Sequence, residues 1–237
     1  MVKETVFAFW EGHMPDYLKL CMDTWHFPVV MLNYKNLSNY TDLKVDASLK
    51  RYTLPQIADV IRVHVLRDQG GYWLDTDTIM ITDDLPSTNM IGDPIKRSNT
   101  IGYLHADKPH SELFEKWAEY QDKIISNPQN LRHIWSIMGN DFTDKYVFNH
   151  EDVTICSVHS CWPETYMISD DVVRQEKYQR FYFESSYHLS DILYTNMLML
   201  HNSWTPDWYK KLSADEVLNR KCTMSNILKE VLVNDVG

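Results

Sequence analysis

The sequence predicts an α/β fold, in which a central and mostly parallel β-sheet is flanked by helices. Short apolar runs of strand length alternate with longer segments of helical periodicity along the 237 residues, and this alternation is typical of parallel sheets covered on both faces. Glycine and proline are sparse, with 7 and 9 residues, and nothing resembles a linker or a repeat. We therefore predict a single domain over residues 1–237, which is long enough to bury a full core.

The first elements follow from apolar runs and their boundaries. Residues 5–10 read Thr-Val-Phe-Ala-Phe-Trp and predict the first strand. A proline at the start of 15–25 suits the first turn of a helix. Residues 28–33 are nearly all apolar, which predicts a strand covered on both faces. Residues 54–68 carry apolar side chains at helical spacing and form the clearest helix, which the glycine pair at 70–71 ends.

The rest of the chain continues the alternation. Further strands are predicted at the apolar runs 72–75, 78–81, 153–158 and 192–200. Further helices are predicted at 111–125, within 130–149, and as one or two helices over 213–233. Two polar stretches, 35–52 and 163–190, show neither period and are expected to be irregular.

Two carboxylates stand at the end of the strand 72–75, in Asp75-Thr76-Asp77. Like charges so close oppose each other's ionisation, whereas a divalent cation removes this cost and would also hold a diphosphate. We therefore predict a metal at Asp75 and Asp77. The ordinary alternative for so short a motif is a solvated strand end.

Asp59 and Arg62 are three residues apart on the preceding helix and therefore share a face. A surface ion pair is the simplest interpretation of such spacing. However, the helix leads directly into the Asp-Thr-Asp strand, so its polar face is expected to reach the same ligand. Arg62 would then bind a phosphate, and Asp59 would bind sugar hydroxyls.

Other residues that follow predicted strands are candidates because ligands of α/β folds bind at the carboxyl ends of strands. Trp10 either packs in the core or stacks on a base. His201 closes an apolar strand, which is expected to place it at the same edge as the two aspartates, and neutral imidazole is a ligand for ions such as Mn²⁺. The segment 138–143 is interpreted as a polar turn with a helix cap.

Charge and composition exclude several classes of protein. The chain has 23 Lys and Arg against 33 Asp and Glu, a net charge of −10, which argues against a nucleic-acid partner. An anionic nucleotide ligand stays compatible if a metal supplies positive charge. No run approaches the ~20 apolar residues of a membrane helix, and no signal peptide precedes the first strand. We expect a cytoplasmic protein with no integral membrane segment, although peripheral membrane contact stays compatible with the sequence.

The block from residue 59 to 78 resembles a known group of enzymes. Its Asp-x-x-Arg, followed by Gly-Gly-x-aromatic-Leu-Asp-x-Asp, is similar to sugar-nucleotide glycosyltransferases that carry a DXD motif on a GT-A fold. The family 32-like enzymes resemble it most, among them capsular polysaccharide transferases, Och1-type yeast mannosyltransferases and the glucosylating domains of clostridial toxins. Segments 6–12, 138–143 and 201–204 resemble further family segments, so the likeness extends over nearly the whole chain.

This resemblance implies a UDP-hexose donor, a Mn²⁺ or Mg²⁺ ion, a glycan acceptor and transfer with retention of the anomeric configuration. Asp75 would contact the ribose and the metal, and Asp77 would ligate the metal directly. Asp59 and Arg62 would bind donor hydroxyls and phosphate. Trp10 would stack on the uracil.

The later segments supply the remaining implied residues. His201 would be the last metal ligand, and Trp204 would lie over the diphosphate. Asp141, together with Asp170 and Asp171, is a candidate for holding donor or acceptor hydroxyls; with Asp75, Asp77 and Arg62, Asp141 completes the predicted catalytic group.

The chain also departs from the family pattern. Trp73 replaces a tyrosine of the toxin-like members, and Asn140 replaces a proline of many members. No added acceptor-binding domain is expected in so short a chain. These departures affect the identity of the acceptor and the sugar more than the donor chemistry.

Two alternatives stay open from the sequence. Residues 74–78 also fit the Asp-x-Asp-x-Thr motif of haloacid-dehalogenase-type phosphatases, with Lys145 and the 170–171 pair in the other required roles. In that family the motif follows the first strand, whereas here it follows two strands and a long helix. The second alternative is a non-catalytic sugar-nucleotide-binding protein on the same fold.

Overall fold

The computed structural model describes residues 5–93, 98–127, 129, 131–147, 153–157, 171–191 and 196–234. The chain divides into two compact units, each assembled from three segments. Unit 1 consists of Met1–Glu11, Phe27–Asp75 and Pro86–Val158, and unit 2 consists of Gly12–His26, Thr76–Leu85 and His159–Gly237. The boundary between Asp75 and Thr76 falls inside the Asp-Thr-Asp motif. This division into compact units does not test the prediction of a single domain over residues 1–237, which stays a prediction.

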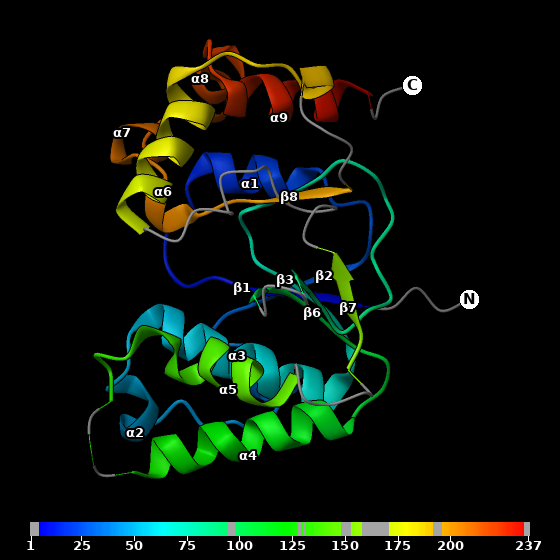
Figure 1. The fold of residues 1–237 in the computed structure, drawn as a ribbon, viewed down its shortest axis with the longest axis vertical. Helices are drawn as coiled ribbons and strands as arrows, with labels where there is room; N and C mark the ends of the chain where they lie inside the picture. Colours follow the sequence, from blue (N-terminus) through cyan, green and yellow to red (C-terminus); the bar gives the residue numbers. More distant parts are fainter. Residues whose placement is uncertain are drawn as a thin grey trace. The chain divides into compact units, whose positions relative to one another are not determined.

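Unit 1 is built on a six-stranded sheet with the order β2-β1-β3-β6-β5-β7 (Figure 1). The strands are β1 (Val6–Phe9), β2 (Val29–Leu32), β3 (Gly71–Leu74), β5 (Met90–Asp93), β6 (Ser98–Ala106) and β7 (Ile155–Ser157). Strand β1 pairs in parallel with β2 and β3, and β5 pairs in parallel with β7. Strand β6 is antiparallel to both β3 and β5. The predicted α/β class is therefore confirmed.

The sheet is mostly parallel, as predicted, and β6 is the one strand of the six that runs the other way. Strand β6 follows β5 too closely in sequence for the crossover of a dozen or more residues that parallel strands require. The strand predicted at 28–33 is β2, which lies at an edge of the sheet. Its first three residues are half-buried and Leu32 is buried.

On one face of this sheet lie α3 (Leu54–Gln69) and α5 (Asn140–Tyr146), and α4 (Glu112–Ser126) packs against α3 in an outer layer (Figure 1). Helix α3 begins with a capping box between Thr53 and Gln56 and ends at Gly70, whose φ is +69°. The predicted helices at 54–68 and 111–125 are thus confirmed. Buried apolar residues of these helices and of β1, β3 and β6 form one continuous core.

Three shorter elements of unit 1 lie between its strands and longer helices in the sequence. They are η1 (Leu37–Asn39), α2 (Ala47–Lys50) and η2 (Trp135–Met138). The segment 138–143, predicted as a polar turn, is instead the junction of two helices. Gly139 separates η2 from α5, and Phe142 and Thr143 are buried within α5.

Gly71 explains why a glycine pair precedes β3. Its φ is +84°, and a Cβ atom at this position would lie 2.6 Å from the carbonyl oxygen of Thr5. The next residue, Tyr72, donates its backbone N–H to the same oxygen at 3.0 Å. The left-handed backbone and the close approach of two strands therefore both require glycine here.

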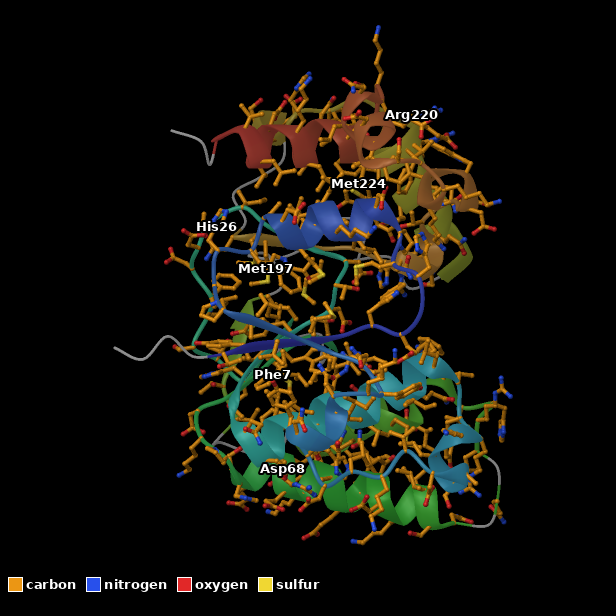
Figure 2. All side chains as sticks on the ribbon, turned by 180° about the vertical axis from the view of Figure 1, so that it is seen from behind. Phe7, His26, Asp68, Met197, Arg220 and Met224 are labelled. Carbon is orange, nitrogen blue, oxygen red and sulfur yellow. The ribbon has the colours of Figure 1, made fainter. Side chains whose placement is uncertain are left out.

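Unit 2 holds a two-stranded antiparallel sheet of β4 (Thr78–Met80) and β8 (Met197–Met199). Its helices are α1 (Asp16–Asp23), α6 (Asp171–Gln179), α7 (Asp207–Lys210), α8 (Ala214–Asn219) and α9 (Thr223–Asn234), with 3₁₀ turns at η7 (Leu189–Asp191) and η8 (Asn202–Trp204). Met197 on β8 and Met224 on α9, labelled in Figure 2, are both fully buried in its core.

The expectation of irregular structure over 163–190 is wrong for its later part. Helix α6 continues into a π-helical turn over Arg180–Glu184, and the earlier part lies outside the described residues. Among the described side chains of this mostly polar helix, Tyr178 is buried, at 1% exposed. None of the helices in the described ranges has both the length and the apolar character needed to cross a membrane.

Candidate functional site

Arg62 stands at the centre of a charged cluster in unit 1. Its side chain is only 6% exposed, and its Nη2 lies 3.0 Å from Asp59 Oδ1 and 3.2 Å from Asp75 Oδ1. Its Nη1 donates to Asp75 Oδ2 at 3.4 Å and to the carbonyl oxygen of Ile101. The guanidinium carbon also lies 5.3 Å from the centre of the Trp73 ring. Asp59 and Arg62 are therefore not an ordinary surface ion pair.

The cluster holds Asp75 in one orientation. In addition to the two contacts from Arg62, the Trp73 indole N–H donates to Asp75 Oδ1 at 2.9 Å. The Asp75 side chain is nevertheless 34% exposed, so its carboxylate is fixed and still accessible to a ligand. Sequence reasoning missed the supporting role of Trp73, although its position two residues before Asp75 on a strand places both side chains on one face.

Asp59 has an unusual proton affinity. Burial raises the pKa of Asp59 from 3.8 to about 7, with the Asp75 charge adding to the rise and Arg62 opposing it. The side chain is 13% exposed. Carboxyl groups perturbed in this way occur preferentially at functional sites, where they can both donate and accept hydrogen bonds near neutral pH.

The segment that carries Asp141 lies beside Asp59. A Cβ atom at Gly139 would be 3.6 Å from Asp59 Oδ2. The buried Gln121 amide donates to the carbonyl oxygens of Asp59, at 3.0 Å, and of Met138, at 2.6 Å. Asp141 is half-buried in the first turn of α5. The resemblance therefore selected a segment that the fold does bring to the cluster.

Trp10 follows β1, and Asp75 follows β3. Because these strands are parallel neighbours, the two residues leave the sheet at the same edge. Trp10 is half-buried, and its indole N–H has no hydrogen-bond partner among the residues that the structure describes. Trp10 and Asp75 thus lie at the carboxyl ends of neighbouring strands, as predicted.

Asp77 immediately precedes β4 in unit 2 and is hydrogen-bonded to the segment 200–202. Its Oδ2 accepts the backbone N–H of Asn202 at 2.6 Å, and its carbonyl oxygen accepts the N–H of Leu200 at 2.9 Å. The Tyr17 hydroxyl donates to Asn202 Oδ1 at 2.5 Å. Tyr17 and Asn202 were not predicted, because a contact across 185 residues has no local sequence signal.

His201 lies at the end of β8, not on the main sheet as predicted. Strand β8 is antiparallel to β4, with Met199 opposite Thr78, so the residues after β8 still meet the residues before β4. This antiparallel register, rather than a shared parallel edge, places His201 at the same end of the small sheet as Asp77.

An aromatic group surrounds His201. Its ring centre lies 3.9 Å from that of Trp204 and 6.0 Å from that of Tyr178, and its backbone N–H donates to the Tyr178 hydroxyl at 3.2 Å. Burial lowers the pKa of His201 to about 4. The imidazole is therefore neutral at physiological pH, which is the form that binds metal ions.

Three further predicted residues complete the set. Asp170 lies outside the described residues, and Asp171 is the first residue of α6. Lys145 is exposed in the last turn of α5. Across the described ranges, no three or more His, Cys, Asp or Glu side chains are grouped so that they could hold a metal ion on their own.

The fold and the site together describe an α/β chain with a buried arginine between two carboxylates, at the strand end where the Asp-Thr-Asp motif begins. The chain belongs to the capsular polysaccharide synthesis protein family, whose model matches residues 2–184. This membership confirms the resemblance to capsular polysaccharide proteins.

Two other comparisons add little. No curated protein matches the chain. A solved structure of the apo-form glycosyltransferase GlyE in Streptococcus pneumoniae TIGR4 is similar, with 13% identity and a TM-score of 0.45. The match covers 100% of this chain and 64% of that chain, so the present chain spans less than two thirds of the length of GlyE.

Proposed function

We propose that this protein is a glycosyltransferase that transfers a hexose from a UDP-linked donor to a glycan acceptor, with the help of Mn²⁺ or Mg²⁺ and with retention. The observation that carries the proposal is the buried Asp59–Arg62–Asp75 cluster in a member of the capsular polysaccharide synthesis family. Buried charges cost several kcal/mol, on the order of the whole ion-pair attraction. An arrangement of this cost is expected where it serves a ligand.

The donor set fits the proposed ion. Asp75, Asp77 and His201 offer carboxylate oxygens and a neutral imidazole, which suit Mn²⁺ and Mg²⁺. Such ions are commonly bound by one or two carboxylates together with substrate phosphates. When bound, the ion would supply positive charge to the departing diphosphate.

Arg62 is proposed to act mainly through Asp75. Four of its contacts already go to Asp59, Asp75 and Ile101, and its buried Nε has no partner within the described residues. These contacts support a positioning role, in which Arg62 and Trp73 hold the Asp75 carboxylate ready for the donor. The direct contact between Arg62 and phosphate stays a prediction.

The remaining residues are proposed to orient the donor. Trp10 would stack on the base, and Trp204 would lie over the diphosphate. Asp59 and Asp141 would bind sugar hydroxyls; a carboxyl group with a pKa near 7 suits this role because it can donate as well as accept. With retention, the acceptor attacks from the face that the diphosphate leaves. A phosphate oxygen then takes the acceptor proton, and no dedicated base is assigned.

The experiment is a panel of UDP- and GDP-linked sugars tested with and without Mn²⁺, by thermal shift and by donor hydrolysis. A ligand that binds only the folded protein raises the melting temperature. Asp77→Asn is the test variant because an amide oxygen still accepts the Asn202 N–H, and the exposed Asp84→Asn is the control. Metal-dependent hydrolysis is expected in the wild type and in Asp84→Asn, with at least a hundredfold loss in Asp77→Asn.

Each other result points elsewhere. Full activity in Asp77→Asn contradicts the proposal. Phosphate release from a phosphomonoester, without any need for a sugar nucleotide, favours the phosphatase alternative. Tight donor binding with neither transfer nor hydrolysis favours a non-catalytic binding protein.

A further inference from the structure

Trp135 is exposed in a position where burial would be expected. It opens η2 in unit 1 and is 65% exposed, the highest value among the large hydrophobic side chains of the described residues. The two other large apolar residues of the same turn, Ile137 and Met138, are buried. A tryptophan left in water on an otherwise packed turn suggests a binding role.

The backbone on both sides of Trp135 is held by buried amides. The Gln56 side chain donates to the carbonyl oxygens of Arg132, at 3.2 Å, and of Ile134, at 2.9 Å. On the other side, Gln121 donates to Met138 O at 2.6 Å. Gln56 and Gln121 are 1% and 0% exposed. The exposed ring is therefore carried by a turn that is fixed to α3 and α4, and binding would order little backbone.

The same contacts place Trp135 near the charged cluster. Gly139, which lies against Asp59, follows Trp135 by four residues. A 3₁₀-helix rises about 2 Å per residue, so the two Cα atoms are roughly 8 Å apart. On α3, Gln56 and Asp59 are separated by about 4.5 Å of helix. The turn thus runs alongside α3 from the first turn of that helix to the Asp59 carboxylate.

A sugar ring is the ligand that this position fits. Pyranose rings present faces of C–H groups, which pack favourably on the electron-rich face of an aromatic ring. A second protein chain would need about 800 Å² on each partner, far more than one exposed tryptophan offers.

We propose that Trp135 forms an acceptor platform, on which a sugar ring of the glycan acceptor stacks beside the Asp59 end of the charged cluster. The proposal rests on the proposed function and deepens it, because it names the surface that binds the acceptor. Trp135 would act on acceptor binding and would leave donor binding and donor hydrolysis unchanged.

The test compares the wild type with Trp135→Ala, Trp135→Phe and a control, Trp208→Ala. Trp208 is also exposed, at 42%, and Arg220 covers its ring at 4.4 Å. Saturation-transfer NMR with lactose, maltose and cellobiose, in the presence of UDP, measures sugar binding. We expect a signal in the wild type that is weakened about three- to tenfold in Trp135→Ala, from the size of an aromatic contact. It should be largely kept in Trp135→Phe and unchanged in Trp208→Ala.

Three results overturn the platform: no sugar signal in the wild type, an equal signal in Trp135→Ala, or a change of oligomeric state in Trp135→Ala, which would indicate a contact between copies. Circular dichroism on the same samples checks that each variant is folded. Donor hydrolysis is measured in parallel, without acceptor. Loss of hydrolysis in the wild type would count against the proposed function, whereas hydrolysis without any dependence of sugar binding on Trp135 would count against the platform alone.

Discussion

Asp59→Asn should change how the stability of the protein depends on pH. The wild-type carboxyl group is held in a buried position where its pKa is raised from 3.8 to about 7. Between these two values the folded protein keeps a proton on Asp59 that the unfolded chain releases. Asparagine has nearly the same shape and carries no titratable proton, so the variant lacks this contribution.

The sign and the size follow from proton linkage. A raised folded-state pKa stabilises the protein fully below the unfolded value of 3.8, and the stabilisation is lost as the pH rises toward about 7. Between these two pKa values the Asp59 contribution to the free energy of unfolding falls by about 1.4 kcal/mol per pH unit. Over the whole interval this amounts to roughly 4 kcal/mol. Relative to Asp59→Asn, the wild type should lose most of this stability between pH 4 and 7 and little above pH 8.

Urea unfolding between pH 4.5 and 8.5, followed by far-UV circular dichroism, measures the free energy of unfolding of both proteins. Because the chain has two compact units, hydrogen exchange of the α3 amides provides a second measurement that is local to Asp59. Asp107→Asn is the matched control, since Asp107 is exposed in the same unit. Its stability difference from the wild type should stay constant over the range.

Two results would refute the reasoning. A difference between wild type and Asp59→Asn that does not vary with pH would show that Asp59 titrates as an ordinary exposed carboxyl group. A wild type that gains stability relative to Asp59→Asn as the pH rises would show that Arg62 dominates over burial and depresses the pKa of Asp59.

Two further substitutions test the cluster and the strand that carries it. Arg62→Met should destabilise the protein by about 3–5 kcal/mol at pH 8, because it removes the buried cation that Asp59 and Asp75 share. Lys19→Met, which removes the partner of Asp16 in a more exposed pair, should cost only a small fraction of that, and equal losses in urea unfolding would contradict this. Gly71→Ala should cost more than the roughly 1–2 kcal/mol of a left-handed alanine, because its Cβ meets Thr5 O at 2.6 Å. Gly12 also has a left-handed φ, of +88°, but a Cβ atom there would meet no other atom within 4 Å. Gly71→Ala should therefore lower the melting temperature more than Gly12→Ala does, and equal melting temperatures would disprove the steric argument.

Local signals in the sequence determined the elements that carry the candidate site. The capping residues and apolar period of α3 lie within one segment, and the positive φ at 70–71 needs only the glycines themselves. For this reason the helix, the turn, the strand after it and the shared face of Asp59 and Arg62 could all be predicted. The placement of Trp10 and Asp75 at carboxyl ends of strands also followed, because each comes directly after an apolar run of strand length. That β1 and β3 are direct neighbours was decided by the tertiary structure, since β2 lies between them in sequence.

Tertiary structure alone decided the properties that give those residues their chemistry. Burial of Arg62 depends on Ile101 and Trp73, and the raised pKa of Asp59 depends on that burial. The pairing of β8 with β4 brings His201 to Asp77 across more than a hundred residues. Such contacts depend on which apolar surfaces pack together across the whole chain. The spacing of apolar residues along one segment shows that the segment has an apolar face, but it does not show which distant segment covers that face.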